Sequence, residues 1–217
     1  MSVQEVKTVL AAEIPSFLRE KEAISELEND VAFREGRFIV QSPYTDRDHL
    51  LDLETLNNEN ALLARALSRL RAVREDYAIA SYKESFNWSE VFHELRQLVT
   101  NSGKEFKETS FYVVAFRSQI KPSTDYSHLG ELDKAAHAEA IASGGFLKYW
   151  FGSPDDELRN LATCLWRSRE DAIQGGKGPS HRKAAGATRS LYAYWKIDQH
   201  RLTIRDNAES WEITDWE

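Results

Sequence analysis

The chain has 217 residues, of which 41% are hydrophobic and 29% charged, and its formal net charge is −7. This balance is typical of a globular protein and argues against a disordered chain or a general binder of nucleic acid. The longest apolar runs fall short of the roughly 20 residues that span a bilayer, and the acidic N-terminal stretch is not typical of a signal peptide. We therefore expect a cytoplasmic protein that binds neither membranes nor nucleic acid.

The N-terminal half reads as helices. Ser2 and Glu5 have capping-box spacing, and so do Thr45 and Asp48. Behind Thr45, apolar residues recur at alternating intervals of three and four, which predicts one helix of roughly 30 residues from Thr45 to Tyr77. Such a seam either packs inside the monomer or pairs two subunits, with its one polar member setting the register; its members are Leu53, Leu56, Asn60, Leu63, Leu67, Leu70 and Tyr77.

A further helix is predicted from Asn87 or Ser89 to Gly103, because apolar residues share one face and glycine favours a helix end. After it the pattern changes to strands and helices in the order β, α, β, β, α, β, which is ferredoxin-like. These elements are FYVVAFRSQI, a helix over 129–143, FLKYWFG, NLATCLWRS, HRKAAGATRSLYAY after a helical turn REDAIQGG, and WKIDQHRLTIRD, with WEITDW as a possible fifth strand. We therefore divide the chain into a helical region, 1–103, and a ferredoxin-like α+β domain, 104–217.

The stretch GGKGP at 175–179 could be a phosphate loop, part of a basic patch for nucleic acid, or a joint before a helix. A phosphate loop needs its glycines directly after a strand and Lys-Ser or Lys-Thr at the helix start, which this stretch lacks. Glycines permit unusual dihedral angles, and proline favours a first helical turn. The stretch is therefore interpreted as a joint.

His137 is the best candidate for acid or base chemistry, because its unperturbed pKa lies near neutrality. It shares a helix face with Asp133 and Ile141, so it could instead be a surface histidine paired with Asp133. Aromatic residues of the second and third strands are the predicted ligand-binding residues around it. The full set of predicted ligand-binding residues is Trp150, Tyr149, Trp166, Arg167, His181 and Arg182, of which the last two could hold an anion or simply be exposed.

No metal site, catalytic serine elbow or cofactor motif is predicted, since the histidines do not follow metal-ligand spacings. The single cysteine, Cys164, is expected to be a small buried hydrophobe in a reducing compartment. One histidine in an apolar pocket can ligate haem, so haem stays open as an alternative.

Two resemblances extend this interpretation. Over about 108–206 the chain resembles the antibiotic-biosynthesis-monooxygenase-like domains of the dimeric α+β barrel superfamily, through Trp166, Ser168, Glu170, Asp171, Ala172, His181, Arg182, Ala184, Tyr192 and Tyr194. Through NENALLARALSRLRAVREDYA, ESFNWSEVF, SGGFLKYWFG and NLATCLWRSREDA it resembles an uncharacterised fungal family, UPF0643, across nearly its whole length. The second resemblance implies no activity.

The superfamily implies a homodimer in which two four-stranded sheets close a barrel, with a pocket in each subunit. Its members include cofactor-independent monooxygenases, isomerases and haem-degrading enzymes, so the fold alone implies no particular reaction. We expect a dimeric small-molecule-binding protein, with monooxygenase-like or proton-transfer chemistry on an aromatic or polyketide-like ligand and no cofactor. The alternative is a non-catalytic dimeric scaffold in which the same aromatic residues form the core.

Overall fold

The structure is a computed structural model and describes residues 36–217. Its centre is a five-stranded antiparallel sheet in the order β4-β5-β3-β6-β7. The strands are β3 (Thr109–Ile120), β4 (Phe146–Phe151), β5 (Arg159–Trp166), β6 (Tyr192–Ile204) and β7 (Trp211–Asp215). Helix α7 (Tyr126–Ser143) follows β3, and α8 (Arg169–Gly175) and α9 (Pro179–Leu191) follow β5. This order confirms the predicted ferredoxin-like fold, and β7 adds a fifth strand to it.

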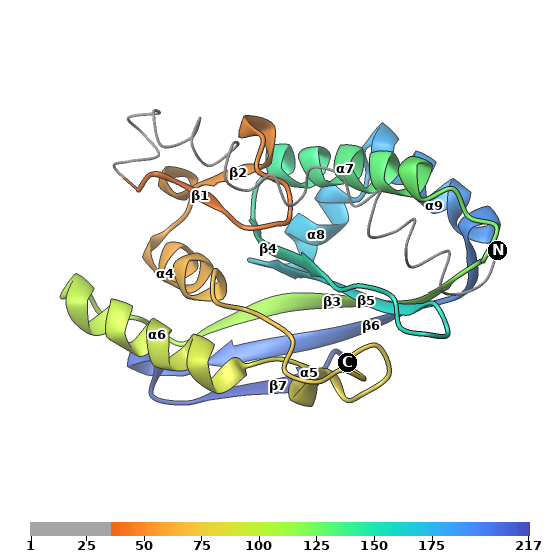
Figure 1. The fold of residues 1–217 in the computed structure, drawn as a ribbon. Helices are drawn as coiled ribbons and strands as arrows, with labels where there is room; N and C mark the ends of the chain where they lie inside the picture. The colour runs from red at the N-terminus through yellow and green to blue at the C-terminus, as the bar shows by residue number, and fades with distance from the viewer. Residues whose placement is uncertain (1–35) are drawn as a thin grey trace.

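Helices cover both faces of the sheet (Figure 1). Helices α7, α8 and α9 lie on the upper face, while α4 (Asn58–Leu67) and α6 (Trp88–Ser102) lie toward the lower face. Alternation along β3 divides the core accordingly, since Phe111 and Val113 join the cluster that contains α4 and α6, and Tyr112 and Val114 join the cluster under α7. The sheet is therefore the middle of three layers.

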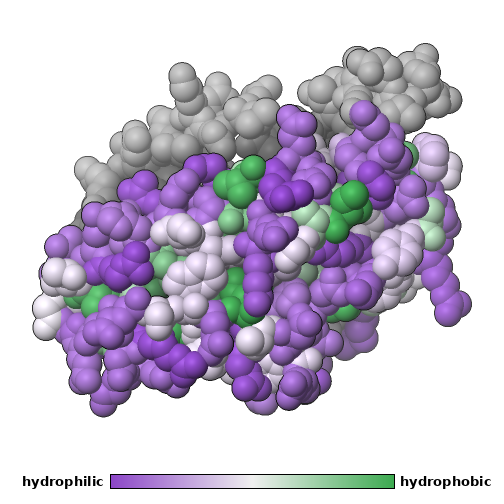
Figure 2. All heavy atoms as spheres, turned by 90° about the horizontal axis from the view of Figure 1, so that it is seen from below, coloured by the Kyte–Doolittle hydropathy of each residue, from purple (hydrophilic) through white to green (hydrophobic). Residues whose placement is uncertain are grey.

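The lower layer comes from this chain itself. Leu63 of α4 and Leu95 of α6 are fully buried in one core with Leu202 and Ile213 of the sheet. Phe92 of α6 stacks on Trp211 of β7, with 4.5 Å between the ring centroids. Seen from below, the surface is mainly hydrophilic, with separate hydrophobic spots (Figure 2). Much of the sheet face that the superfamily leaves to a partner is thus covered by α4 and α6.

The predicted helix from Thr45 to Tyr77 is wrong, because local hydrogen bonds divide the segment. Strands β1 (Phe38–Val40) and β2 (Leu50–Asp52) pair with each other, with the 3-10 turn η1 (Arg47–His49) between them and the turn η2 (Leu53–Thr55) after them. The Asp52 carboxylate accepts a bond from the Glu54 N–H, and the Asn57 side chain caps α4 at the Asn60 N–H. Both are side-chain bonds that compete with a continuous helix.

After Leu67, the Asn87 side chain binds the backbone at both Arg69 and Arg71, and only the short helix α5 (Tyr82–Ser85) precedes α6. Asn60 is buried inside the monomer, at 1% exposure. It therefore cannot set the register between two subunits in this structure.

Other boundaries follow their local signals. Gly103 ends α6 in the left-handed conformation, at φ 64°, and Pro179 opens α9 after Gly178, as the joint interpretation requires. The predicted helix over HRKAAGATRSLYAY is too long, because Tyr192 already pairs with Ile120 in β6. The predicted helix that begins at Ser2 lies outside the described residues.

Candidate functional site

The side chain of His137 extends from α7 into the interior, toward the segment that contains η1. Its side chain is 5% exposed, and its Nδ1 is 2.7 Å from Nδ1 of His49. In a bond between two neutral imidazoles only one ring can carry the shared proton, so the two histidines must hold different tautomers. The alternative of a surface histidine paired with Asp133 is therefore wrong.

Asp133 has different partners, one turn before His137. Its carboxyl accepts hydrogen bonds from the hydroxyls of Tyr44 and Tyr149, the second at 2.6 Å. Burial raises the pKa of Asp133, although the two tyrosine bonds oppose this. An ion pair between Lys134 and Asp46 adds a third link between α7 and the segment before β2. We call Tyr44, His49, Asp133, His137 and Tyr149 the α7 cluster.

The two histidines of the α7 cluster are uncharged near neutral pH. Burial, together with the neighbouring His49 and His181, lowers the pKa of His137 to about 3. Burial also lowers the pKa of His49. Nε2 of His137 is buried and makes no hydrogen bond to the described residues. A neutral imidazole with a free ring nitrogen can bind a polar group or accept a proton.

The predicted aromatic residues do not all meet at His137. Tyr149 and Trp166 belong to the core under α7, where Trp166 packs edge-on against Phe146, and Phe146 packs edge-on against His137. Trp150 lies on the other face of the sheet, against Phe86. Adjacent residues of a strand face opposite ways, so Tyr149 and Trp150 cannot line one pocket.

The predicted cationic residues make bonds within the fold. Arg167 forms an ion pair with Asp171 at 2.7 Å, and Arg182 donates to the carbonyl of Lys177. His181 Nδ1 lies 3.2 Å from the carboxylate of Glu139. Burial would raise the pKa of Glu139, but N–H groups at the start of α9 bind the carboxylate and lower the pKa to about 2. His181 and Glu139 therefore hold α9 against α7.

Cys164 is half-buried and packs against the core under α7. Burial raises the pKa of its thiol, so the thiol stays protonated at neutral pH. It therefore behaves as an apolar side chain.

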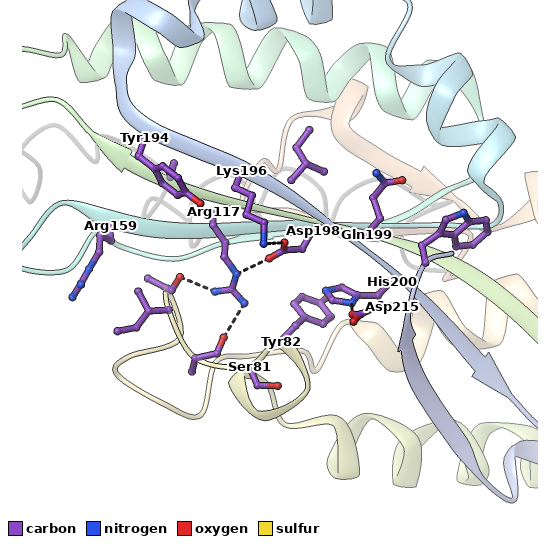
Figure 3. A pocket seen from close by; sticks show the side chains of 16 residues that line it. Ser81, Tyr82, Arg117, Arg159, Tyr194, Lys196, Asp198, Gln199, His200 and Asp215 are labelled. Carbon is purple, nitrogen blue, oxygen red and sulfur yellow. Dashed lines mark hydrogen bonds and ion pairs between the residues drawn. The ribbon is translucent and has the colours of Figure 1, made fainter.

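An open cleft of about 710 Å³ lies on the lower side of the sheet, beside α5 (Figure 3). Its walls are the segment 78–82 and the exposed part of β6, and its ends are Arg159 of β5 and the C-terminal residues of the chain. The residues that line it include Ile79, Tyr82, Arg117, Tyr194, Lys196, His200 and Asp215. A volume in this range suits a small molecule.

Arg117 shapes this cleft. Its guanidinium donates to the carbonyl oxygens of Ala78, at 2.7 Å, and Ala80, at 2.8 Å, and to the carboxylate of Asp198, at 2.9 Å (Figure 3). Lys196 binds the same carboxylate at 2.6 Å. Arg117 therefore fixes the wall segment to the sheet, and its charge is already neutralised.

His200 is the histidine that lines the cleft. Its Nδ1 is 3.1 Å from Oδ1 of Asp215, its opposite residue on β7, and its ring stacks on Tyr82 at 4.8 Å and 17°. Burial lowers the pKa of His200, against the effect of Asp215. Its Nε2 is buried and makes no bond to the described residues. If Nδ1–H donates to Asp215, Nε2 carries a free lone pair.

Sequence reasoning missed this cleft. His200 and Asp215 are brought together only by the pairing of β6 with β7. The wall segment 78–82 follows the end of the predicted long helix, where the sequence pattern predicts no element. Within residues 36–217 no three His, Cys, Asp or Glu side chains are grouped as metal ligands, and no helix is long and apolar enough to cross a membrane.

Comparison with solved structures finds partial likenesses at low identity. SnoaB, a cofactor-independent oxygenase from Streptomyces nogalater, is 12% identical, and the likeness covers 42% of this chain and 90% of SnoaB at a TM-score of 0.35. Rv0793 from Mycobacterium tuberculosis is 18% identical, with 42% and 92% covered at a TM-score of 0.37. These scores are too low to add to the fold that the strand order defines.

Comparison with curated proteins and family models finds a closer relation. UPF0643 protein PB2B2.08 of Schizosaccharomyces pombe is 39% identical over 184 residues, which cover 81% of this chain and 83% of the relative. The model of the PB2B2.08-like family matches residues 40–215, which include the α7 cluster, the sheet and the cleft. The resemblance to UPF0643 is thereby confirmed, and the chain belongs to the PB2B2.08-like family.

Proposed function

We propose that this protein binds a small aromatic molecule in the cleft beside His200 and can carry out proton transfer on it. The observation that carries this proposal is the coincidence of an open cleft of about 710 Å³ with the His200–Asp215 pair. The monooxygenase-like and proton-transfer chemistry expected from the sequence is thus assigned to the cleft instead of to His137.

The walls favour a flat and largely uncharged ligand. Ile79 is 57% exposed and Tyr194 is 52% exposed, and both line the cleft. The cations Arg117 and Lys196 already bind Asp198, so neither is free to bind an anionic ligand strongly. Aromatic ligands gain most from such walls, because their rings bury apolar area and stack.

Proton transfer follows from the tautomer that Asp215 favours. With the proton held at Nδ1, Nε2 of His200 can accept a proton from a ligand hydroxyl or an acidic C–H. Nε2 is buried beneath its neighbours in the unliganded protein, so the ligand must displace part of the wall around Tyr82 to reach it. Binding is therefore expected at the cleft even where proton transfer is absent.

The α7 cluster is the second candidate site. It is favoured by one observation, the buried and unbonded Nε2 of His137 beside an uncharged histidine partner. In this alternative, the ligand enters between α7 and the sheet and contacts His137, the residue that the sequence favours for acid or base chemistry.

A binding experiment separates the two candidates. The probe is 1,8-dihydroxyanthraquinone, a polycyclic phenol, and the measurement is quenching of tryptophan fluorescence during titration. We expect saturable binding by the wild-type protein, and at least tenfold weaker binding by Ile79→Glu, because a charge on the cleft wall opposes a flat apolar ring. Ile173→Glu is the matched control, since Ile173 is 44% exposed on α8, away from the cleft.

Equal binding by all three proteins would contradict the proposal. A loss of binding in His137→Gln, with Ile79→Glu unaffected, would move the site to the α7 cluster. For proton transfer, the measurement is the absorbance change that marks the phenolate form of the bound probe, which forms when a phenol O–H gives its proton to Nε2 of His200. We expect this change in the wild type and not in His200→Gln.

A further inference from the structure

The first half of strand β6 has one unpaired edge. Strand β7 pairs with β6 only from His200 to Ile204, and the N–H of Trp216 binds the carbonyl of Gln199 at 2.9 Å. Residues 192–198 of β6 pair with β3 on one side and with no described strand on the other. An unpaired edge presents free backbone N–H and C=O groups.

The open edge is also unusually apolar. Tyr194, Trp195 and Ile197 are 52%, 46% and 39% exposed, and they make up half of the exposed large hydrophobic residues among the described part of the chain. Soluble proteins normally protect such an edge with lysine, proline, a bulge or a covering element. Here Lys196 is the single basic residue within 192–198, and the register with β3 shifts once, at Ala193, which leaves 194–198 regular.

We propose that two copies of this chain pair through residues 192–198 of β6, antiparallel about a two-fold axis at Trp195, so that their two sheets become one. The proposal goes beyond small-molecule binding. It also differs from the face-to-face barrel that the superfamily resemblance implies, because α4 and α6 of the same chain cover much of that face.

The backbone directions favour this axis. The carbonyl of Gln199 points to the open edge, because Trp216 binds it there. Directions alternate along a regular strand, so the N–H and C=O groups of Trp195 and Ile197 also point outward. The register between β6 and β3 shifts at Ala193, so the alternation does not extend to that residue. With the axis at Trp195, Trp195 forms a hydrogen-bonded pair with its own copy, and the partner's Ile197 lies opposite Ala193.

Neighbouring axes fit less well. An axis at Lys196 would put two ammonium groups directly opposite each other, which is unfavourable across a strand pair. It would also leave Ala193 opposite the partner's Gln199, whose carbonyl is already occupied. Pairing about Trp195 uses the open segment 192–198 in full.

The side chains suit the same register. On one face, the two Trp195 rings meet at the axis, and Ile197 lies opposite the partner's Ala193. On the other face, Tyr194 lies opposite the partner's Lys196, an arrangement that permits a cation–π contact. Cross-strand pairs of these kinds each stabilise a sheet by a few tenths to about 1 kcal/mol. A short strand pair of this kind is expected to dissociate in the micromolar range.

The first test is the mass of the full chain in solution, measured by light scattering up to about 100 µM. We expect the wild type to approach twice its 24.9 kDa as concentration rises. Trp195→Glu should stay at 24.9 kDa, because two carboxylates would face each other at the axis. Ile173→Glu, which adds the same charge to another exposed hydrophobic residue, should behave as the wild type.

The second test measures the register. Residues opposite each other in a hydrogen-bonded pair have Cα atoms about 5.5 Å apart, a distance that a disulfide spans. Trp195→Cys should therefore give a covalent dimer under mild oxidation, whereas Ile173→Cys should not.

Three results would overturn the proposal. A wild-type protein that stays monomeric up to 100 µM has no such interface. A dimer that survives in Trp195→Glu uses another surface. Failure of Trp195→Cys to cross-link in a protein that still dimerises refutes the axis.

Discussion

The burial of His137 predicts a loss of stability in mild acid. In the unfolded chain a histidine has a pKa near 6.5, and in the folded protein burial lowers the pKa of His137 to about 3. A lowered pKa contributes stability that is present above 6.5 and is lost as the pH falls toward the folded value. At pH 5.0 His137 is therefore protonated in the unfolded state and unprotonated in the folded state.

The magnitude follows from the two pKa values. Between pH 7.5 and pH 5.0 the free energy of unfolding should fall by about 2 kcal/mol through His137 alone. Any folded pKa below about 4 gives nearly the same loss at pH 5.0, so the figure depends little on the exact value. His49 and His200, whose pKa values burial also lowers, add to the fall in the wild type.

A variant isolates the contribution of His137. His137→Gln keeps a polar side chain beside His49 and does not titrate. Urea unfolding followed by tryptophan fluorescence at both pH values gives the free energies of wild type and variant. The variant should be less stable at pH 7.5, and its deficit should shrink by about 2 kcal/mol at pH 5.0. An equal deficit at both pH values would refute the reasoning, because His137 would then titrate alike in both states.

Four further results are expected. Asp133→Ala should lower the free energy of unfolding by about 2–4 kcal/mol in urea unfolding, since it leaves two tyrosine hydroxyls without their acceptor; Asp133→Asn should cost less. A fragment 104–217 should bind the dye ANS strongly and lack cooperative thermal unfolding, because it exposes the sheet face that α4 and α6 cover. Arg117→Met should speed proteolytic cleavage within 77–81 without changing the circular dichroism, because the guanidinium bonds to the carbonyl oxygens of Ala78 and Ala80 and to the carboxylate of Asp198 are lost. Gly145→Ala should unfold at a lower temperature than wild type, since Gly145 has φ 74° and an added Cβ would lie 2.4 Å from Asp171.

The sequence predicts the second half of the fold because its signals are local. The aromatic and β-branched residues of FYVVAFRSQI, the glycines that end α6 and α7, and the proline that opens α9 each act within a few residues. The helix over 45–77 fails for the opposite reason. Its apolar spacing is real, since Leu63 and Leu67 are fully buried, but Asp52, Asn57 and Asn87 divert the backbone through side-chain bonds that periodicity does not reveal.

The candidate sites show the same limit. Helical spacing puts Asp133 and His137 on one face, and they do lie together against the sheet. Their partners are His49, which lies inside the predicted helix from Thr45, and Tyr44, which lies just before it, so the pattern does not reveal the bonds between them. His200 and Asp215 are neighbours only through strand pairing, and single-sequence patterns do not specify which strands pair.

The covered lower face has a consequence for how the chain is made. The core between the sheet and α6 is closed by Trp211 and Ile213 of β7. Because α4 and α6 precede β7 in the chain, they are synthesised before the strand that completes their core. Folding of the lower layer is therefore completed only once β7 has emerged from the ribosome, and the apolar faces of α4 and α6 are most exposed to aggregation before that point.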